Sequence, residues 1–463
     1  MSEEFLGYHS EWNLGSPGGW DYQRITQEIS KAVWNRIYPL SGLRVNLNFD
    51  HPFLCPVNGF VEMLVKAWRI REGGNTGLIA VMAEEETLED VTENRNLVRH
   101  LNRIEGVKSV LLAPHHLEII NGNISYLGKP VGLIFMDFNT NVLLDLHRKH
   151  NLAPVLQAVR EGRVINPRGT EPVNSKGVFE ILTDPDKNSL FNPETVRRTP
   201  WTRQFYNRKT NGPDNKEIPD LIEWTRKNWN DLVLKPERGY SGKGVKVGGK
   251  DTDIDNIIEN ALKTGDYIVQ KKIPLKLWGE MIPELDMAEQ SVRLKQFQTD
   301  FRCLFGEGVM MGFLGRVGGV PTNVGSGGGV QSIAVVDENI DIRDLTNRIN
   351  EAIINLGFEK VAEISKFQNN LALENRFTYL LGPIKIALRP RLLKVSQMKA
   401  LEKYCEGIWA DCLILERMWK SDELGIKMEI DPEELEIIRS QPWNGSPAIL
   451  ASDGLFSFGA HIL

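Results

Sequence analysis

The spacing of apolar residues predicts alternating helices and strands in the first third of the chain. Apolar residues recur at helical spacing within residues 21–37, which predicts an amphipathic helix. Further helices are predicted over 57–70 and 91–104, and strands over 43–49, 77–82, 107–112 and 131–138. Alternating strands and helices imply a mainly parallel sheet, which binds ligands outside the carboxyl ends of its strands. The polar residues that follow two of these strands, Asn48 and Asp50, then Asp137 and Asn139, are candidates for substrate contact, with turn and helix-cap chemistry as the alternative explanation.

The most informative stretch of the chain is 232–247, LVLKPERGYSGKGVKV. An apolar run, a glycine-rich segment and a second alternating run predict a strand, a flexible loop and a returning strand. The loop holds Gly239, Ser241, Gly242 and Gly244, and Lys235 lies at the end of the first strand. Glycines let backbone N–H groups approach a phosphate, and a lysine adds a positive charge. No helix follows, so this is neither a Walker A loop nor a dinucleotide fingerprint; a plain turn is the alternative.

Two neighbouring stretches add nucleotide-like features. Lys176 lies where a helix is expected to begin, a position at which the helix dipole disfavours a cation unless an anion is bound beside it. A solvated lysine is the alternative. Residues 267–273, YIVQKKI, predict a strand that leads into a hinge, and the backbone around Gln270 and Ile273 could hydrogen-bond and stack against an adenine.

Residues 294–331 predict a hairpin followed by a glycine-rich loop. Asp300 and Arg302 are two residues apart and therefore lie on one face of a strand, and the return strand ends at Arg316. Two arginines on neighbouring strands could converge on one carboxylate or phosphate, with surface ion pairing as the alternative. The segment that follows, VGGVPTNVGSGGGVQ, favours the anion-binding interpretation.

The two ends of the chain each contain a candidate metal ligand. Near the start, Glu11 and Asn13 share one strand face and precede the turn sequence LGSPGG, and such oxygen ligands suit Mg²⁺. An exposed strand end is the alternative. Helices are predicted over 345–356, 392–418 and 432–440, and the final residues, 447–463, predict strands with Asp453 at the end of an apolar run.

Composition places these motifs in an ordinary globular protein. The 463 residues are 41% hydrophobic and 25% charged, with a formal net charge of −6, so a nucleic-acid partner is not expected. The acidic start MSEEFLGYHSEW is not a signal peptide, and the sequence has no run of about 18 apolar residues. We therefore expect a cytoplasmic protein with no membrane partner.

Taken together, Lys176, the 232–247 hairpin, Gln270, Asp300-x-Arg302, Arg316 and the GSGGG loop resemble the ATP-grasp fold. The arrangement most resembles the circularly permuted group that includes glutathionylspermidine synthase and related carboxylate–amine ligases. In that group the metal site is an Asp on one strand and Glu-x-Asn on the next. Asp453, Glu11 and Asn13 match it from opposite ends of the chain, so the resemblance implies a further permutation that brings the two ends together.

The resemblance implies a mixed α+β and α/β fold with a helical subdomain. The expected divisions are a metal-site strand at 1–19, a substrate-side α/β domain at 20–165, a lid subdomain at 166–275, the ATP-grasp core at 276–340, a helical subdomain at 341–440 and a returning hairpin at 441–463.

The resemblance also implies a role for each candidate residue. ATP is expected at Lys176, Lys235, Gly239, Ser241, Gly242, Gly244, Gln270 and Ile273; Mg²⁺ at Glu11, Asn13 and Asp453; and catalysis at Arg316 and Arg302. The acid and amine are expected at Asn48, Asp50, Asp137 and Asn139, and at Asn323, Ser326, Gly327 and Gly328 of the glycine-rich loop.

The implied reaction is amide formation from a small-molecule carboxylate and an amine through an acyl phosphate, with release of ADP and phosphate. Two alternatives on the same fold are an ATP-dependent phosphotransferase and a non-catalytic nucleotide-binding protein. A homodimer is compatible with the resemblance.

Overall fold

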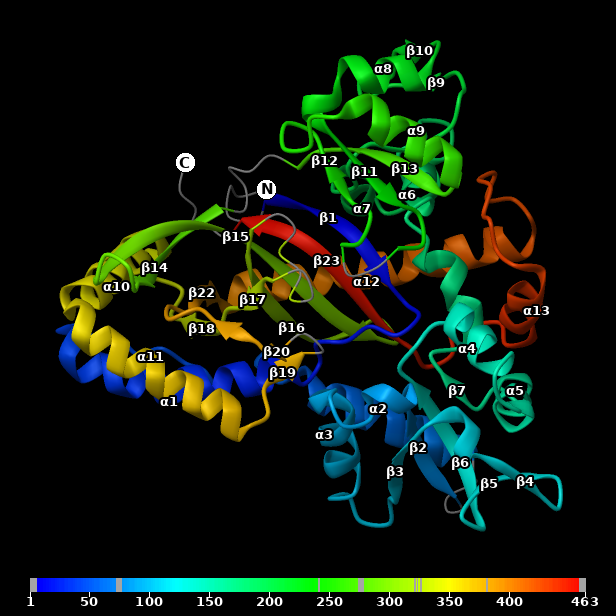
Figure 1. The fold of residues 1–463 in the computed structure, drawn as a ribbon, viewed down its shortest axis with the longest axis horizontal. Helices are drawn as coiled ribbons and strands as arrows, with labels where there is room; N and C mark the ends of the chain where they lie inside the picture. Colours follow the sequence, from blue (N-terminus) through cyan, green and yellow to red (C-terminus); the bar gives the residue numbers. More distant parts are fainter. Residues whose placement is uncertain are drawn as a thin grey trace.

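The computed structural model describes residues 6–71, 77–239, 242–273, 279–319, 322, 324, 327–379 and 382–457. Its centre is a seven-stranded sheet in the order β1-β23-β15-β16-β17-β21, with β14 paired to β15. The strands are β1 (Leu6–Asn13), β14 (Gly279–Asp286), β15 (Ser291–Gly306), β16 (Val309–Gly318), β17 (Gly329–Val330), β21 (Lys385–Ile386) and β23 (Ile449–Ser457). Figure 1 shows the first strand, in blue, beside the last, in red. The expected proximity of the chain's two ends is therefore observed for β1 and β23.

One face of this central sheet is covered by the long helix α12 (Val395–Lys420). Its apolar stripe, which includes Leu401, Ile408 and Cys412, packs against Phe301 and Phe305 of β15. The remaining helices of this end of the chain are α10 (Ile342–Asn355), α11 (Gly357–Glu374) and α13 (Pro432–Ser440). The helices predicted over 345–356, 392–418 and 432–440 are thus present.

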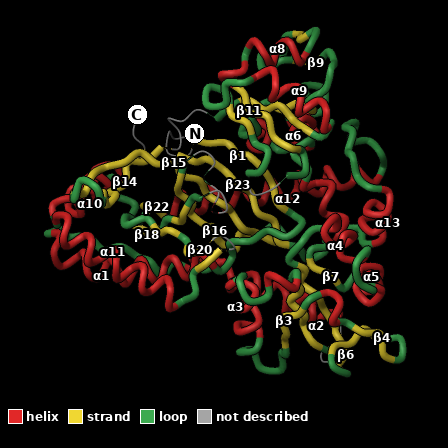
Figure 2. The backbone as a smooth tube through the Cα atoms, in the orientation of Figure 1, coloured by secondary structure: helices red, strands yellow, loops and turns green. Residues whose placement is uncertain are grey.

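A second layer contains α1 (Tyr22–Ser41), which lies beside α11 in Figures 1 and 2. Ile29 and Val33 of α1 share a core with Ile349 of α10 and Ile364 of α11. The predicted helix at 21–37 is present, but it packs with the helices of 341–377 and not with the parallel sheet that follows it in sequence. The expected domain 20–165 therefore does not begin at residue 20.

The strand predicted over 43–49 is wrong. These residues are extended and bury alternate side chains, with Leu47 and Phe49 in the core, but only Asn48 pairs, through a single bridge to Val335. The apolar alternation is real, but the segment pairs with the neighbouring strand at this one residue only, so no ladder forms. Val335 belongs to β18 (Ile333–Val336), which pairs in parallel with β22 (Arg391–Lys394).

The α/β unit at the bottom of Figure 1 contains the predicted parallel sheet. Its order is β3-β2-β6-β5-β4, with β7 also paired to β6, and β3, β2, β6 and β7 run parallel. The strands are β2 (Leu78–Met82), β3 (Ser109–Leu112), β4 (Glu118–Ile120), β5 (Asn123–Tyr126), β6 (Lys129–Met136) and β7 (Val164–Ile165). Its helices are α2 (Pro56–Arg71), α3 (Thr92–Leu101), α4 (Thr140–His147) and α5 (Ala153–Arg160). The side chains of α2 fill the space between this sheet and β15 and β23 of the central sheet.

A small antiparallel sheet, at the top of Figure 1, has the order β12-β11-β13-β8. Its strands are β8 (Thr202–Gln204), β11 (Leu232–Pro236), β12 (Lys246–Val247) and β13 (Tyr267–Lys271). The elements around it are α6 (Val178–Leu182), α7 (Pro193–Arg197), α8 (Leu221–Lys227), α9 (Ile254–Thr264), β9 (Thr210–Asn211) and β10 (Glu217–Ile218). A separate two-stranded sheet is formed by β19 (Thr378–Tyr379) and β20 (Gly382–Pro383). The predicted strand, loop and returning strand at 232–247 are confirmed, because β11 pairs with β12.

No helix in the described part of the chain combines the length and the apolar character that crossing a membrane requires.

Candidate active site

The predicted metal ligands lie on two paired strands of the central sheet. Glu11 of β1 is the register partner of Asp453 of β23, and a bulge immediately before Glu11 displaces Ser10 from the ladder. Directly opposed residues of an antiparallel pair project from the same face, and Asn13, two residues beyond Glu11, shares that face. Three oxygen-bearing side chains from the two ends of the chain therefore project from one face of the sheet.

The two predicted catalytic arginines both contact Asp453. Arg302 donates from Nε and Nη2 to the two carboxylate oxygens at 2.7 and 2.8 Å, and Arg316 Nη2 lies 3.0 Å from Oδ2. Arg316 also donates to Asp300 at 2.7 and 3.0 Å. Burial alone would raise the pKa of Asp453, but the two guanidinium groups hold that pKa well below its usual range. The expected convergence of two arginines on an anion is observed, and the anion is the Asp453 carboxylate.

Two lysines face this cluster from the small sheet and the segment before it. Lys235 Nζ donates to Gln270 Oε1 at 2.8 Å and to the carbonyl of the displaced Ser10 at 3.4 Å. Lys176 Nζ lies 3.3 Å from Glu11 Oε2 and donates to the carbonyl of Gly239. The pKa of Lys235 is lowered to about 8, mainly by burial; Glu11 opposes this shift, and the charge on Lys176 contributes to it. Bringing two ammonium groups together in this way costs free energy that a bound anion would recover.

These lysines line a cleft of about 410 Å³ between the small sheet and the central sheet. The lining includes the predicted Gly239, Gly242, Gln270 and Ile273. It also includes an apolar wall that the sequence reasoning missed, made by Val233, Val247 and Leu455 together with Ile273. Such volumes and mixed linings are typical of small-molecule sites. A flat apolar base could lie against the valines while its phosphates reach the lysines.

The glycine loop closes one side of the cleft. Gly242 and Gly244 have φ values of 72° and 75°, which L-residues rarely adopt. A Cβ on Gly244 would lie 2.7 Å from Pro236 Cγ, so this position requires glycine for two reasons. Ser241, also predicted to bind ATP, lies outside the described residues. Lys243, between the two glycines, lines the cleft and was not predicted, although its place in the loop was visible in the sequence.

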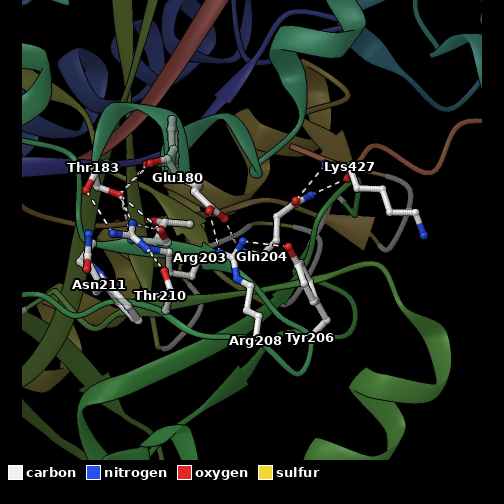
Figure 3. A network of polar contacts seen from close by, with 12 residues as sticks. Glu180, Thr183, Arg203, Gln204, Tyr206, Arg208, Thr210, Asn211 and Lys427 are labelled. Atoms are coloured by element: carbon white, nitrogen blue, oxygen red, sulfur yellow. Dashed lines mark hydrogen bonds and ion pairs between the residues drawn. The ribbon is translucent and has the colours of Figure 1, made fainter. Parts of the chain in front are cut away.

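A network of polar contacts holds the small sheet in place (Figure 3). The side chain of Gln204, on β8, accepts from the backbone N–H of Lys427 at 3.0 Å and donates to Glu237 at 3.1 Å. Its own backbone N–H donates to Glu180 at 2.6 Å, and Glu180 also accepts from Arg208 at 2.6 Å. Because β8 pairs with β13, this network fixes the strand that carries Gln270.

A second pocket, of about 450 Å³, adjoins the cleft. The two share Glu11, Lys176 and Arg316, and the second is also lined by Asn13 and Arg302. Its opposite wall contains the predicted Asp137 and Asn139 and the unpredicted Glu84 from the carboxyl ends of the parallel strands. Tyr379 of β19, which was also not predicted, lines the pocket as well. Glu84 follows β2, so the same sheet-edge reasoning would have identified it.

The charges of this second pocket differ between its two ends. At the shared wall Lys176 and Arg316 lie beside one carboxylate, Glu11, whereas Glu84 and Asp137 lie at the strand ends. Burial raises the pKa of Asp137 to about 6, partly offset by the 2.6 Å hydrogen bond from Asn94 Nδ2. Burial also raises the pKa of Glu84. These carboxyl groups favour a cationic ligand. An ammonium beside them would lower their raised pKa values and so stabilise the carboxylate form.

Several predicted substrate residues lie elsewhere. Asn48 and Asp50 line neither pocket. Asp50 forms an ion pair with Lys31 at 2.6 Å on the surface, and the backbone of Asn48 forms a β-bridge with β18. The reason is that the segment 43–49 lies beside β18 and shares the core of α1, α10 and α11, so it is not part of the parallel sheet. Gly327 and Gly328 are also absent from both linings, and Asn323 and Ser326 lie outside the described residues.

The donor set around Glu11 fits a hard divalent cation. Two carboxylates and an amide on one sheet face are the oxygen ligands that Mg²⁺ takes together with substrate phosphates. Asn13 Nδ2 is buried with no hydrogen-bond partner among the described residues, and Oδ1 of the same amide is the atom that would bind a cation. Asp453 is committed to two arginines and would coordinate through its remaining lone pairs.

The chain is similar in structure to several solved proteins, at low sequence identity. The chain is similar to a glutathione synthetase-like effector from Globodera pallida, with 15% identity and a TM-score of 0.40 over 69% of this chain and 68% of that one. A D-alanine–D-alanine ligase from Bacillus anthracis aligns with 12% identity and a TM-score of 0.29 over 52% of this chain and 64% of that one. A RimK domain ATP-grasp protein from Sphaerobacter thermophilus aligns with 13% identity and a TM-score of 0.29 over 73% and 99%.

No protein-family model matches the sequence, and no curated protein matches it. The mixed α+β fold is confirmed, whereas the circular permutation stays a prediction.

Proposed function

We propose that this protein is an ATP-dependent ligase that joins a carboxylate to an amine. The observation that carries the proposal is the wall shared by the two pockets. Glu11, Lys176 and Arg316 face both a cleft suited to a nucleotide and a second pocket with cationic and anionic ends. A γ-phosphate held at that wall would lie within reach of a carboxylate bound in the second pocket.

In the cleft, each chemical part of ATP has a matching set of residues. The apolar wall of Val233, Val247 and Ile273 suits the base, and backbone groups of β13 and the hinge after it suit its polar edge. Lys176 and Lys235 suit the phosphates, and phosphate binding would return the pKa of Lys235 toward its ordinary value. Mg²⁺ held by Glu11, Asn13 and Asp453 would supply charge neutralisation at the β- and γ-phosphates.

The reaction divides into two steps. An oxygen of the substrate carboxylate attacks the γ-phosphorus, the bond to the β-phosphate oxygen breaks, and ADP leaves with the bonding electrons. The nitrogen of the amine then attacks the carbonyl carbon of the acyl phosphate; phosphate leaves, and the amine loses a proton. Phosphoryl transfer of this kind needs positioning and charge stabilisation more than covalent help from the protein.

Arg302 and Arg316 are suited to stabilise the charge that develops in both steps. Asp453 accepts hydrogen bonds from both, which fixes the guanidinium planes before substrate binds. Groups held in place in advance stabilise a transition state without reorganising during the reaction. At the other end of the pocket, Asp137 and Glu84 would attract the ammonium form of the amine and, as their pKa values are raised, could accept its proton.

The test is ADP formation from Mg²⁺-ATP with a panel of amino acids, small peptides, other carboxylic acids and polyamines. The variants are Glu11→Gln and Arg316→Lys, which retain size or charge, and the matched control is Glu62→Gln on an exposed position of α2. Thermal unfolding of each protein separates a lost site from a lost fold.

If the protein is a ligase, ADP release should require both an acid and an amine. The rate of release should fall on the order of 100-fold or more in both site variants and stay unchanged in the control. A phosphorylated product without an amide would show a phosphotransferase instead. ATP binding with no turnover on any pair would contradict the proposal.

A further inference from the structure

A third cavity is lined by several arginine side chains, and its residue Thr92 lies in sequence between Val91 and Glu93, which line the second pocket. It has a volume of about 290 Å³ and lies where α3 meets the start of α1 and the end of α11. Its cations are Arg24, Arg95, Arg99, Arg103 and Arg376, and His100 also lines it. It shares no lining residue with the two pockets of the candidate active site.

Part of this charge is neutralised by neighbouring carboxylates. Arg24 pairs with Asp21 at 2.6 Å and with Glu28 at 2.8 Å, and Arg95 pairs with Glu89 at 2.5 Å. His100 also lies beside Asp21, at 3.5 Å. Within the described part of the chain, the net positive charge of the cavity therefore comes from the other three guanidinium groups, those of Arg99, Arg103 and Arg376.

Arg99, Arg103 and Arg376 make no ion pair with a carboxylate among the described residues, and Glu374 is the acidic residue in the lining. Five arginines against Asp21, Glu28, Glu89 and Glu374 leave a local charge of about +1 in a chain whose net charge is −6. Like charges gathered in a concave site repel one another, and a bound dianion would remove that repulsion.

The backbone around the cavity is tied together, which keeps these cations near one another. Asn96 Nδ2 donates to Asp21 Oδ2 at 2.6 Å, which joins α3 to α1. The Thr92 hydroxyl donates to the carbonyl of Arg376, which joins α3 to the end of α11. Arg99 and Arg103 are four residues apart on the same side of α3 and the turn that follows it.

We propose that this cavity binds a small phosphorylated ligand that carries at least two negative charges. The guanidinium fork presents parallel N–H donors that match phosphate oxygens, and three forks from two elements suit a tetrahedral dianion or a diphosphate. The proposal does not depend on the ligase activity.

The test measures binding of inorganic pyrophosphate, without Mg²⁺, by isothermal titration calorimetry at low ionic strength. The nucleotide cleft could also bind this probe, so all proteins carry Lys235→Met. The test variant is Arg103→Gln with Arg376→Gln, and the charge-matched control is Arg160→Gln with Arg348→Gln, two exposed arginines outside the three cavities. All four positions are exposed, so the fold should be retained.

We expect the test variant to bind pyrophosphate at least about tenfold more weakly than the parent, which carries Lys235→Met alone. The control should bind it within about twofold of that parent. Equal affinity in the test and control variants would overturn the proposal. Citrate added at the same charge and ionic strength distinguishes phosphate recognition from charge alone. Citrate binding as tight as that of pyrophosphate, or tighter binding of a single-stranded oligonucleotide, would also overturn it.

Discussion

Lys235 gives the protein a pH-dependent stability whose size follows from its surroundings. Burial in the cleft lowers its pKa from 10.5 to about 8. Between these two pH values the unfolded chain binds more protons at this lysine than the folded chain does, so the free energy of unfolding rises with pH in that window. Below pH 8 both states are charged and the full penalty of burying the ammonium applies. Above about pH 10.5 both are neutral and the penalty disappears.

The magnitude follows from about 1.4 kcal/mol for each pKa unit. A shift from 10.5 to about 8 corresponds to a full penalty of about 3.4 kcal/mol, of which about 2.6 kcal/mol is removed between pH 7 and pH 10. Water in the open cleft screens the charge, so we expect an observed change of about 2 kcal/mol.

The assay is urea unfolding of the wild type and of Lys235→Met at pH 7 and pH 10. Methionine keeps the apolar stem and cannot titrate, so the difference between the two proteins isolates the lysine from other groups that titrate in this range. The unfolding free energy of the wild type, relative to the variant, should be about 2 kcal/mol higher at pH 10. A difference that stays constant to within about 0.5 kcal/mol would show that the ammonium is fully solvated and would refute the reasoning.

Two further substitutions test the site. Asp453→Asn leaves two buried arginines without their shared carboxylate and should lower the unfolding free energy by about 3 kcal/mol in urea, whereas an unchanged midpoint would mean that the carboxylate does not hold them. Gly244→Ala places a Cβ against Pro236 at positive φ and should cost about 1–3 kcal/mol and raise the KM for ATP. Gly106→Ala is its matched control, because Gly106 has a similar φ of 79° but open space around it, and equal effects of the two on KM would argue against a role for the loop.

Local sequence patterns predicted the elements of the site well, because each pattern is completed within a few residues. The hairpin at 232–247 is fixed by its own apolar runs and glycines, and β11 and β12 pair as expected. The segment 43–49 shows the limit of that reasoning. Its alternation correctly predicts which side chains are buried, but a strand also needs a neighbour, and the segment meets only Val335.

Contacts between distant parts of the chain were harder to predict. The position of Asp453 beside Glu11 came from a family resemblance and not from any local signal, and β1 and β23 confirm that proximity. Nothing in the sequence indicated that Arg302 and Arg316 would both bond to Asp453, because that depends on the order of the strands in the central sheet. The cationic cavity was missed for the same reason: its arginines come from α1, from α3 and the turn after it, and from the segment that follows α11.

The acyl-phosphate step is tested most directly by following oxygen from the acid to phosphate. The acids of the substrate panel are labelled with ¹⁸O in their carboxyl groups, incubated with ATP, Mg²⁺, the amines and the protein, and the released phosphate is analysed by mass spectrometry. An acyl-phosphate ligase transfers one labelled oxygen to each phosphate as the amide forms. Phosphate that carries no label, released at the rate at which ADP appears, would contradict the proposed ligase.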